Sequence, residues 1–370
     1  MTGNRTPALL AVPVVVLAFA AAGLADDDLW IEPRCTPLPF ENVGPFARLG
    51  DGSLLVIDDN ATRVSKDDGK TWSDPRPIYD GPKPGVPSKS SVLVRTREGA
   101  LVLVYMDSST YKWGWDQSRR DAVDDAQLDV WSIRSPDDGR TWVDRQQVSD
   151  GYCGALIDMI QASTGEVVCP IQDLLHDPGR HGIYVFVSPD EGHSWRRSNL
   201  IDLGGSGHHD GAIEPTLAEL ADGRLWMLIR TNWDRFWEAY SDDKGRSWRT
   251  IHPGKIDASS APPYMLRLAS GRLALVWNRL YPEGETETDR KGGDGQLSEA
   301  AASWHRNELS LAFSDDDGKT WTDPVVIARR PAGGLSYPYL FEPNPGELWV
   351  TTRFSFHVHL SLREEEFVGK

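Results

Sequence analysis

Glu214 and Arg230 form the pair of residues in this sequence whose types and spacing are best suited to chemistry. Two apolar runs lie between them, separated by an Asp222-Gly223 turn signal. A hairpin of this length brings its two ends back together, so we expect the carboxylate and the guanidinium to lie side by side. An arginine fork binds a carboxylate through two bonds, and a glutamate can accept a proton from a reacting group. The alternative is an ordinary surface ion pair.

Two further residues near the end of the chain are candidates for the same site. Tyr337 lies in the segment Gly334-Leu335-Ser336-Tyr337-Pro338, and Arg306 stands just before an apolar run at 309–313. Tyr337 could instead be an aromatic residue that packs between structural units. Arg279 and Arg290 lie in the same stretch as Arg306 and compete with it for the role of an anion-binding arginine.

These residues are set in a chain that repeats itself. Five segments fit the pattern Ser-x-Asp-x-Gly-x-(Thr/Ser)-Trp, namely residues 65–72, 135–142, 188–195, 241–248 and 314–321. The Asp can accept backbone N–H bonds across a tight turn, the Gly can adopt a positive φ, and the Trp can anchor the turn by packing. Short apolar or alternating runs on either side read as strands, so each unit is predicted to be a small antiparallel sheet.

The spacing of the repeats predicts an all-β, six-bladed β-propeller. Successive copies starting at residues 135, 188 and 241 are 53 residues apart, and about fifty residues suit one four-stranded blade with its loops. The two longer intervals contain polar, Gly-rich inserts at 107–129 and 281–305. Inserts of this kind commonly emerge on one face of a propeller, where ligands bind.

The end of the chain provides too few strands for a complete last blade. After the fifth repeat we predict three strands, near 337–342, 347–354 and 356–362. Residues 29–32, which precede the first unit, are expected to supply the fourth and so close the ring and remove its exposed edges. Residues 26–370 are therefore predicted to form one domain.

The N-terminus predicts export. Arg5, an apolar run over 7–24 and the small residues before Asp26 match the three parts of a secretory signal at 1–25. An uncleaved membrane anchor is the alternative, because the run approaches spanning length. We expect a secreted or periplasmic monomer with no membrane attachment after cleavage. The formal net charge of -16 argues against a nucleic-acid partner.

Neither a disulfide framework nor a cofactor is expected. Of the three cysteines, Cys153 and Cys169 flank one predicted hairpin and either pair or remain as thiols. The histidine-containing segments 176–181 and 208–210 do not have the spacing of a usual metal-ligand set. No nucleotide-binding motif is present, so the expected cofactor is none and the expected metal is none.

The five repeats resemble the Asp box, or BNR repeat, of the sialidase (neuraminidase) superfamily, and the resemblance extends over nearly the whole chain after residue 26. It implies roles for the residues already named. Glu214 would polarise Tyr337, the nucleophile, while Arg230 and Arg306 would hold the carboxylate of the substrate. A neutral phenol suits this task, because an anionic nucleophile would be repelled by the carboxylate of a sialic acid.

The sequence departs from the sialidase pattern in its first unit. Sialidases usually carry an Arg-Ile-Pro segment there, followed by a long loop with an acid/base Asp, whereas this chain reads Glu41-Asn42-Val43-Gly44-Pro45-Phe46. Lys89 and Asp116, from the next unit and its insert, are the candidates for a displaced cation and acid. Asp210, just before Glu214, is a second candidate for the acid.

Together these features predict an exported glycoside hydrolase, exo-acting on sialic acid or another acidic sugar. Two alternatives remain open at this level. One is a propeller glycosidase for a different glycan, which the departure in the first unit would permit. The other is a non-catalytic propeller that binds carbohydrate or protein, because the repeats specify a fold and not a reaction.

Overall fold

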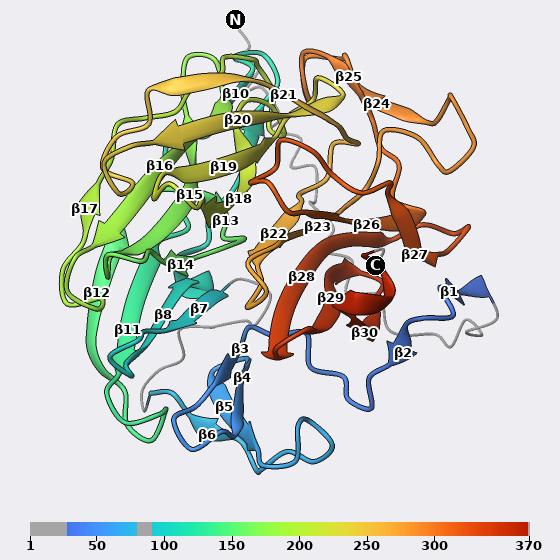
Figure 1. Cartoon of the computed structure of the whole chain (residues 1–370). Coiled ribbons are helices and arrows are strands. Elements are labelled where there is room, and N and C mark those ends of the chain that lie inside the picture. Colours follow the sequence, from blue (N-terminus) through green and yellow to red (C-terminus); the bar gives the residue numbers. More distant parts are fainter. Residues whose placement is uncertain (1–27, 80–90, 369–370) are drawn as a thin grey trace, which may run out of the picture.

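The computed structural model describes residues 28–79 and 91–368, which form six antiparallel sheets arranged around a central axis (Figure 1). The predicted six-bladed β-propeller is confirmed. The predicted signal segment and Lys89 lie outside the described residues. No helix in the described ranges combines the length and the apolar character needed to cross a bilayer.

The first three blades follow one another along the chain. The first contains β3 (Phe46–Arg48), β4 (Leu54–Asp58), β5 (Ala61–Ser65) and β6 (Arg76–Pro77). The second contains β7 (Ser91–Arg95), β8 (Leu101–Met106), β11 (Val130–Ser135) and β12 (Val143–Ser149). The third contains β13 (Cys153–Ala155), β14 (Ile160–Gln161), β15 (Val167–Leu175), β16 (Arg180–Ser188) and β17 (Arg196–Arg197).

The last three blades complete the ring. The fourth contains β18 (Ile213–Glu219), β19 (Leu225–Arg230), β20 (Arg235–Ser241) and β21 (Thr250–Asp257). The fifth contains β22 (Tyr264–Arg267), β23 (Leu273–Trp277), β26 (Glu308–Ser314) and β27 (Val325–Arg329). The sixth contains β28 (Leu335–Asn344), β29 (Glu347–Ser355) and β30 (His359–Arg363).

The five repeats form the same hydrogen-bonded turn. In the first copy, the Asp67 carboxylate accepts the Thr71 N–H at 2.8 Å and the Thr71 hydroxyl at 2.6 Å, while the Gly69 N–H donates to Ser65 Oγ at 2.8 Å. Equivalent bonds recur in the other four copies. The positive φ of Gly69, 83°, explains the glycine of the pattern.

The ring closes differently from the prediction for residues 29–32. β1 (Trp30–Ile31) pairs with β27 and extends the fifth blade, and the following β2 (Thr36–Pro37) pairs with β30 and completes the sixth. The Cys35 N–H donates to the Glu32 carbonyl at 2.8 Å, so a tight turn carries the chain from one blade to the next. The expected strand therefore exists six residues later, and the N-terminal segment covers two sheet edges.

Both inserts form small hairpins of their own. Residues 107–129 contain the 3-10 turn Ser108–Thr110, β9 (Trp115–Asp116) and β10 (Asp121–Ala122), and residues 281–305 contain β24 (Arg290–Gly292) and β25 (Ala301–Ser303). The two inserts touch, because Arg120 Nε donates to the Gly295 carbonyl at 3.2 Å. They therefore meet on one face of the propeller. The chain ends with a second 3-10 turn, Glu364–Glu366, after β30.

All three cysteines are buried free thiols, which decides the alternative left open for Cys153 and Cys169.

Candidate active site

Tyr337 and Glu214 are in direct contact. The Tyr337 hydroxyl donates to Glu214 Oε1 at 2.5 Å, although the two residues come from the sixth and the fourth blade. Glu214 is buried, whereas the Tyr337 side chain is partly exposed and can be reached from solvent. This contact places a proton acceptor directly beside a phenolic oxygen.

Unusual backbone geometry presents both side chains. Glu214 has φ 46° and Tyr337 has φ 57°, values in the left-handed region that residues other than glycine rarely adopt. The ladder between β18 and β19 is irregular between Ile213 and Thr216, and the Glu214 N–H donates to Gln172 Oε1 at 3.0 Å instead of to a strand partner. Such irregularities turn a side chain toward a site, and strained residues of this kind cluster at functional sites.

Arg230 lies beneath this pair. Its Nη1 contacts Glu214 Oε2, and its Nε and Nη2 donate to Ser260 Oγ at 3.1 and 3.0 Å. The side chain is only 1% exposed, so the sequence alternative of a surface ion pair is wrong. The neighbouring carboxylate raises the pKa of Arg230 against the opposing effect of burial, so the guanidinium is a fixed positive charge.

The electrostatics keep Tyr337 protonated. Burial, followed by the negative charge of Glu214, raises the pKa of Tyr337 to about 12, although Arg230 and Arg306 lower it. At neutral pH the phenol is therefore neutral. It can become a nucleophile only while its proton passes to an acceptor, and Glu214 Oε1 is in place to take it.

Arg306 borders the same pair, whereas Arg279 lines a separate cavity and Arg290 pairs with Asp234. The Arg306 guanidinium carbon lies 5.7 Å from the centre of the Tyr337 ring and 4.5 Å from that of Trp304. Nη2 donates to the Ser260 carbonyl at 3.1 Å, whereas the buried Nε has no partner among the described residues. A buried guanidinium with an unused N–H is suited to receive an anion.

The structure adds Arg353, which sequence reasoning missed. This buried residue lies on β29, opposite Tyr337 in the β28–β29 hairpin, and its Nε donates to the Val43 carbonyl at 3.4 Å. Val43 belongs to the first-unit segment that lacks the expected arginine. Nη2 of Arg353 is buried without a partner in the described residues. The sequence signal for Arg353 is its position near the end of the strand that pairs with the Tyr337 segment, since Arg230 likewise ends the strand that pairs with the Glu214 segment.

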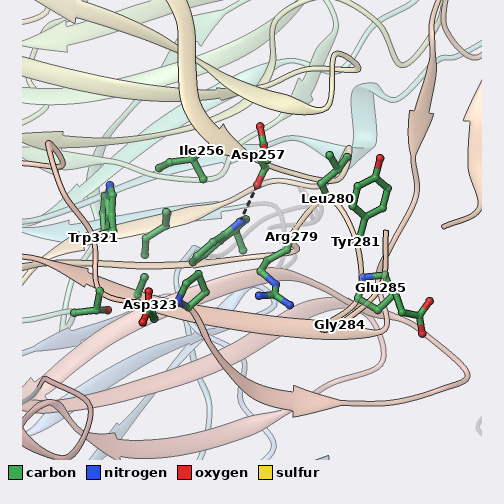
Figure 2. A pocket seen from close by; sticks show the side chains of 15 residues that line it. Ile256, Asp257, Arg279, Leu280, Tyr281, Gly284, Glu285, Trp321 and Asp323 are labelled. Carbon is green, nitrogen blue, oxygen red and sulfur yellow. Dashed lines mark hydrogen bonds between the residues drawn. The ribbon is translucent and has the colours of Figure 1, made fainter. Parts of the chain in front are cut away.

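A cavity of about 280 Å³ opens above these groups. Its lining includes Glu214, Tyr337, Arg353 and Phe354, together with residues 154–157. Figure 2 shows a different and larger cavity of about 550 Å³ beside the fifth blade, where Trp277 Nε1 donates to the Asp257 carbonyl at 3.3 Å. The cavity of Figure 2 is larger, but the paired phenol and carboxylate line the first.

The two candidate acids are engaged in other contacts. The buried Asp210 carboxylate accepts the N–H groups of Ser206, Gly211 and Glu299 at 3.1, 2.9 and 2.8 Å, so it fixes the backbone. Asp116 accepts the hydroxyl and N–H of Ser118, and these bonds lower its pKa, the hydroxyl bond most. A carboxyl group that is ionised in this way at neutral pH has no proton to donate.

Within residues 28–79 and 91–368, no group of three or more His, Cys, Asp or Glu side chains is arranged to hold a metal ion.

Comparisons with known proteins agree with this fold. A family model described as a BNR repeat-like domain matches residues 58–350. A sialidase from Clostridium perfringens is 26% identical over 242 residues, which is 56% of this chain and 60% of that protein, so the chain spans under two thirds of its relative's length.

Solved structures extend the likeness to the propeller as a whole. A sialidase from Streptococcus pneumoniae aligns with a TM-score of 0.59 at 13% identity, over 92% of this chain and 70% of that one. An α-L-arabinanase from Penicillium chrysogenum aligns with a TM-score of 0.55 at 15% identity, over 92% and 96% of the two chains. At these identities the structures establish the fold alone.

Proposed function

We propose, from the premise that this chain belongs to the BNR repeat-like domain family and resembles sialidases, that it is a glycoside hydrolase acting on a terminal acidic sugar. One observation carries the proposal: the Tyr337 hydroxyl is bonded to Glu214 at 2.5 Å in the lining of a cavity that also includes Arg353. Two solved structures with this fold are named a sialidase and an α-L-arabinanase, so the fold is compatible with the chemistry.

The reaction would proceed in two displacements. Tyr337 Oη attacks the anomeric carbon while its proton passes to Glu214 Oε1, and the bond from that carbon to the leaving oxygen breaks. The leaving oxygen departs as an anion and takes a proton from solvent. Water then attacks the anomeric carbon of the glycosyl-tyrosine on the face that the leaving group vacated and releases its proton to solvent. The bond from that carbon to Tyr337 Oη breaks, and Glu214 returns the proton to the phenolate. The configuration at the anomeric carbon is retained.

The arginines supply the preference for an acidic sugar. Arg306 and Arg353 each keep a buried N–H without a partner in the described residues, on two sides of Tyr337. A substrate carboxylate beside the anomeric carbon would accept these N–H groups in charge-assisted bonds. In this proposal Arg353, from the sixth blade, takes the place of the arginine that the first blade lacks.

The proton donor for the leaving group affects which substrates would be cleaved. Glu214 is the one carboxyl group among the described residues that line the cavity. Leaving groups that depart as stable anions, such as 4-methylumbelliferone, are therefore expected to react fastest.

The test is release of 4-methylumbelliferone from its α-sialoside by the full chain. Tyr337→Phe should reduce kcat by at least about 10³-fold, while Tyr281→Phe, in the separate cavity of Figure 2, should change it by less than twofold. Equal activity of Tyr337→Phe and the wild type would refute the nucleophile. Failure of the folded wild type on the sialoside, with turnover of a neutral arabinoside, would refute the acidic substrate.

A further inference from the structure

A continuous strip of aromatic and imidazole rings runs over the face that carries the inserts. Neighbouring ring centres along it are 4.6, 6.5, 5.5, 4.6 and 6.4 Å apart. In order, the members of this ring strip are Tyr152, Trp113, Trp115, His208, His209 and Trp304. None of the six has a role in the reaction proposed above.

The ring strip begins at the candidate active site. The Trp304 ring lies 4.5 Å from the guanidinium carbon of Arg306 and 5.6 Å from that of Arg230. Each member of the ring strip is at least partly exposed, whereas the blade-packing rings of Trp248 and Trp349 are almost completely buried. The ring strip is therefore a surface that continues outward from the arginines, and not a part of the core.

Hydrogen bonds hold the segment that carries His208 and His209 against the insert at 281–305. The backbone N–H groups of His208 and His209 donate to the carbonyls of Gln296 and Leu297 at 3.0 and 2.9 Å. Asp210 adds a bond from the Glu299 N–H at 2.8 Å, which explains why its carboxylate is buried. A surface preorganised in this way binds a ligand without an additional ordering cost.

The chemistry of the ring strip suits neutral sugars. Desolvation by the surrounding groups lowers the pKa of His208 and of His209, so both imidazoles are neutral at pH 7. Their Nδ1 atoms lie 2.6 Å apart in a mutual hydrogen bond. Indole and phenol faces pack against the C–H faces of pyranose rings, and the ring N–H and O–H groups meet their hydroxyls.

We propose that the ring strip binds the neutral sugar residues on the leaving-group side of a glycan while the terminal sugar occupies the cavity beside Tyr337. This inference rests on the proposed function for its direction, because Trp304 joins the ring strip to Arg306 and Arg230. It specifies the substrate further, as a sugar chain of several residues rather than an isolated terminal sugar.

The experiment measures binding without turnover. The full chain carrying Tyr337→Phe is titrated with lacto-N-tetraose and with arabinotetraose, and binding is followed by saturation-transfer NMR and tryptophan fluorescence. Trp113→Ala and Trp115→Ala are each added to this background. Trp233→Ala is the matched control, because that indole packs on Trp237 in the fourth blade, outside the ring strip.

We expect at least one tetrasaccharide to bind, and each ring-strip variant to weaken its binding by about tenfold or more, while Trp233→Ala changes it by less than twofold. In wild-type background, the same two variants should raise KM for a sialylated tetrasaccharide and leave the 4-methylumbelliferyl α-sialoside unaffected. Circular dichroism of each variant checks the fold.

Absence of binding by both tetrasaccharides, or equal binding by Trp113→Ala, Trp115→Ala and the control, would overturn the inference. Preferential binding of an apolar aglycone or a peptide would overturn it as well. The result is readable even if the sialoside is not hydrolysed, because tetrasaccharide binding to Tyr337→Phe does not depend on turnover. Loss of hydrolysis and loss of the ring-strip subsite are thus separate outcomes.

Discussion

Glu214→Gln tests both the electrostatics and the chemistry of the candidate site. The substitution keeps the size of the side chain and removes its charge. Glu214 contacts Arg230 Nη1 through one carboxylate oxygen and accepts the Tyr337 hydroxyl at 2.5 Å through the other. Arg230 is 1% exposed, and it also donates to the neutral Ser260 hydroxyl. The variant therefore leaves a buried guanidinium without its counter-charge.

The magnitude follows from that burial. Removing one partner of a buried ion pair costs about 3–5 kcal/mol. An unfolding entropy of about 2.1 cal/mol/K per residue, taken over the 370 residues of the chain, gives about 0.8 kcal/mol per degree. We therefore expect Tm to fall by about 4–6 °C. Loss of the proton acceptor should in addition reduce kcat by about 10²–10⁴-fold.

Calorimetry and turnover of the α-sialoside measure the two effects separately. Arg230→Met in the Glu214→Gln background is the matched control, because it removes the uncompensated charge and should recover most of the lost Tm. Activity should not return with it. A Glu214→Gln protein with unchanged Tm, or a double variant less stable than both single variants, would refute the reasoning about the buried pair.

Three other predictions follow from the structure. Arg353→Met should raise KM for the sialoside about tenfold or more, because one charge-assisted bond to the substrate is lost; unchanged steady-state kinetics would exclude Arg353 from binding. Ser241→Ala should lower the free energy of unfolding by about 1–2 kcal/mol, because the buried Ser241 hydroxyl accepts the Gly245 N–H at 2.9 Å; identical urea midpoints would contradict this. Burial lowers the pKa of His305 to about 4, whereas the unfolded chain has an ordinary His pKa of about 6.5. As pH falls, the unfolded chain therefore takes up this proton first. The free energy of unfolding is unaffected by His305 above pH 6.5 and decreases from there toward pH 4. His305→Leu should reduce the stability difference between pH 7.5 and pH 4.5 by up to about 3 kcal/mol in urea titrations, and an unchanged difference would show that the imidazole is not the titrating group.

The sequence by itself determined the local features of this protein. Each repeat is a turn whose bonds join residues at most four positions apart, as in the bond from the Thr71 N–H to Asp67, so its pattern could be read directly. Glu214 and Arg230 belong to one hairpin, and strand pairing with a short turn brought them together as predicted. The ring of six blades followed from the number and spacing of such units, because each unit buries its faces only against neighbours.

Tertiary structure decided the contacts between distant parts of the chain. Tyr337 reaches Glu214 across the axis, and Arg353 reaches the Val43 carbonyl because the last blade closes beside the first. The closing strand was placed six residues too early, because short edge strands such as Thr36–Pro37 carry little periodicity of their own. The sequence could not show that the Asp210 carboxylate accepts the Glu299 N–H, because Glu299 lies far along the chain in the insert at 281–305. A local sequence pattern determines each turn and each hairpin. Contacts between residues of different blades depend instead on the twist of the six sheets, which sets how the blades pack around the ring.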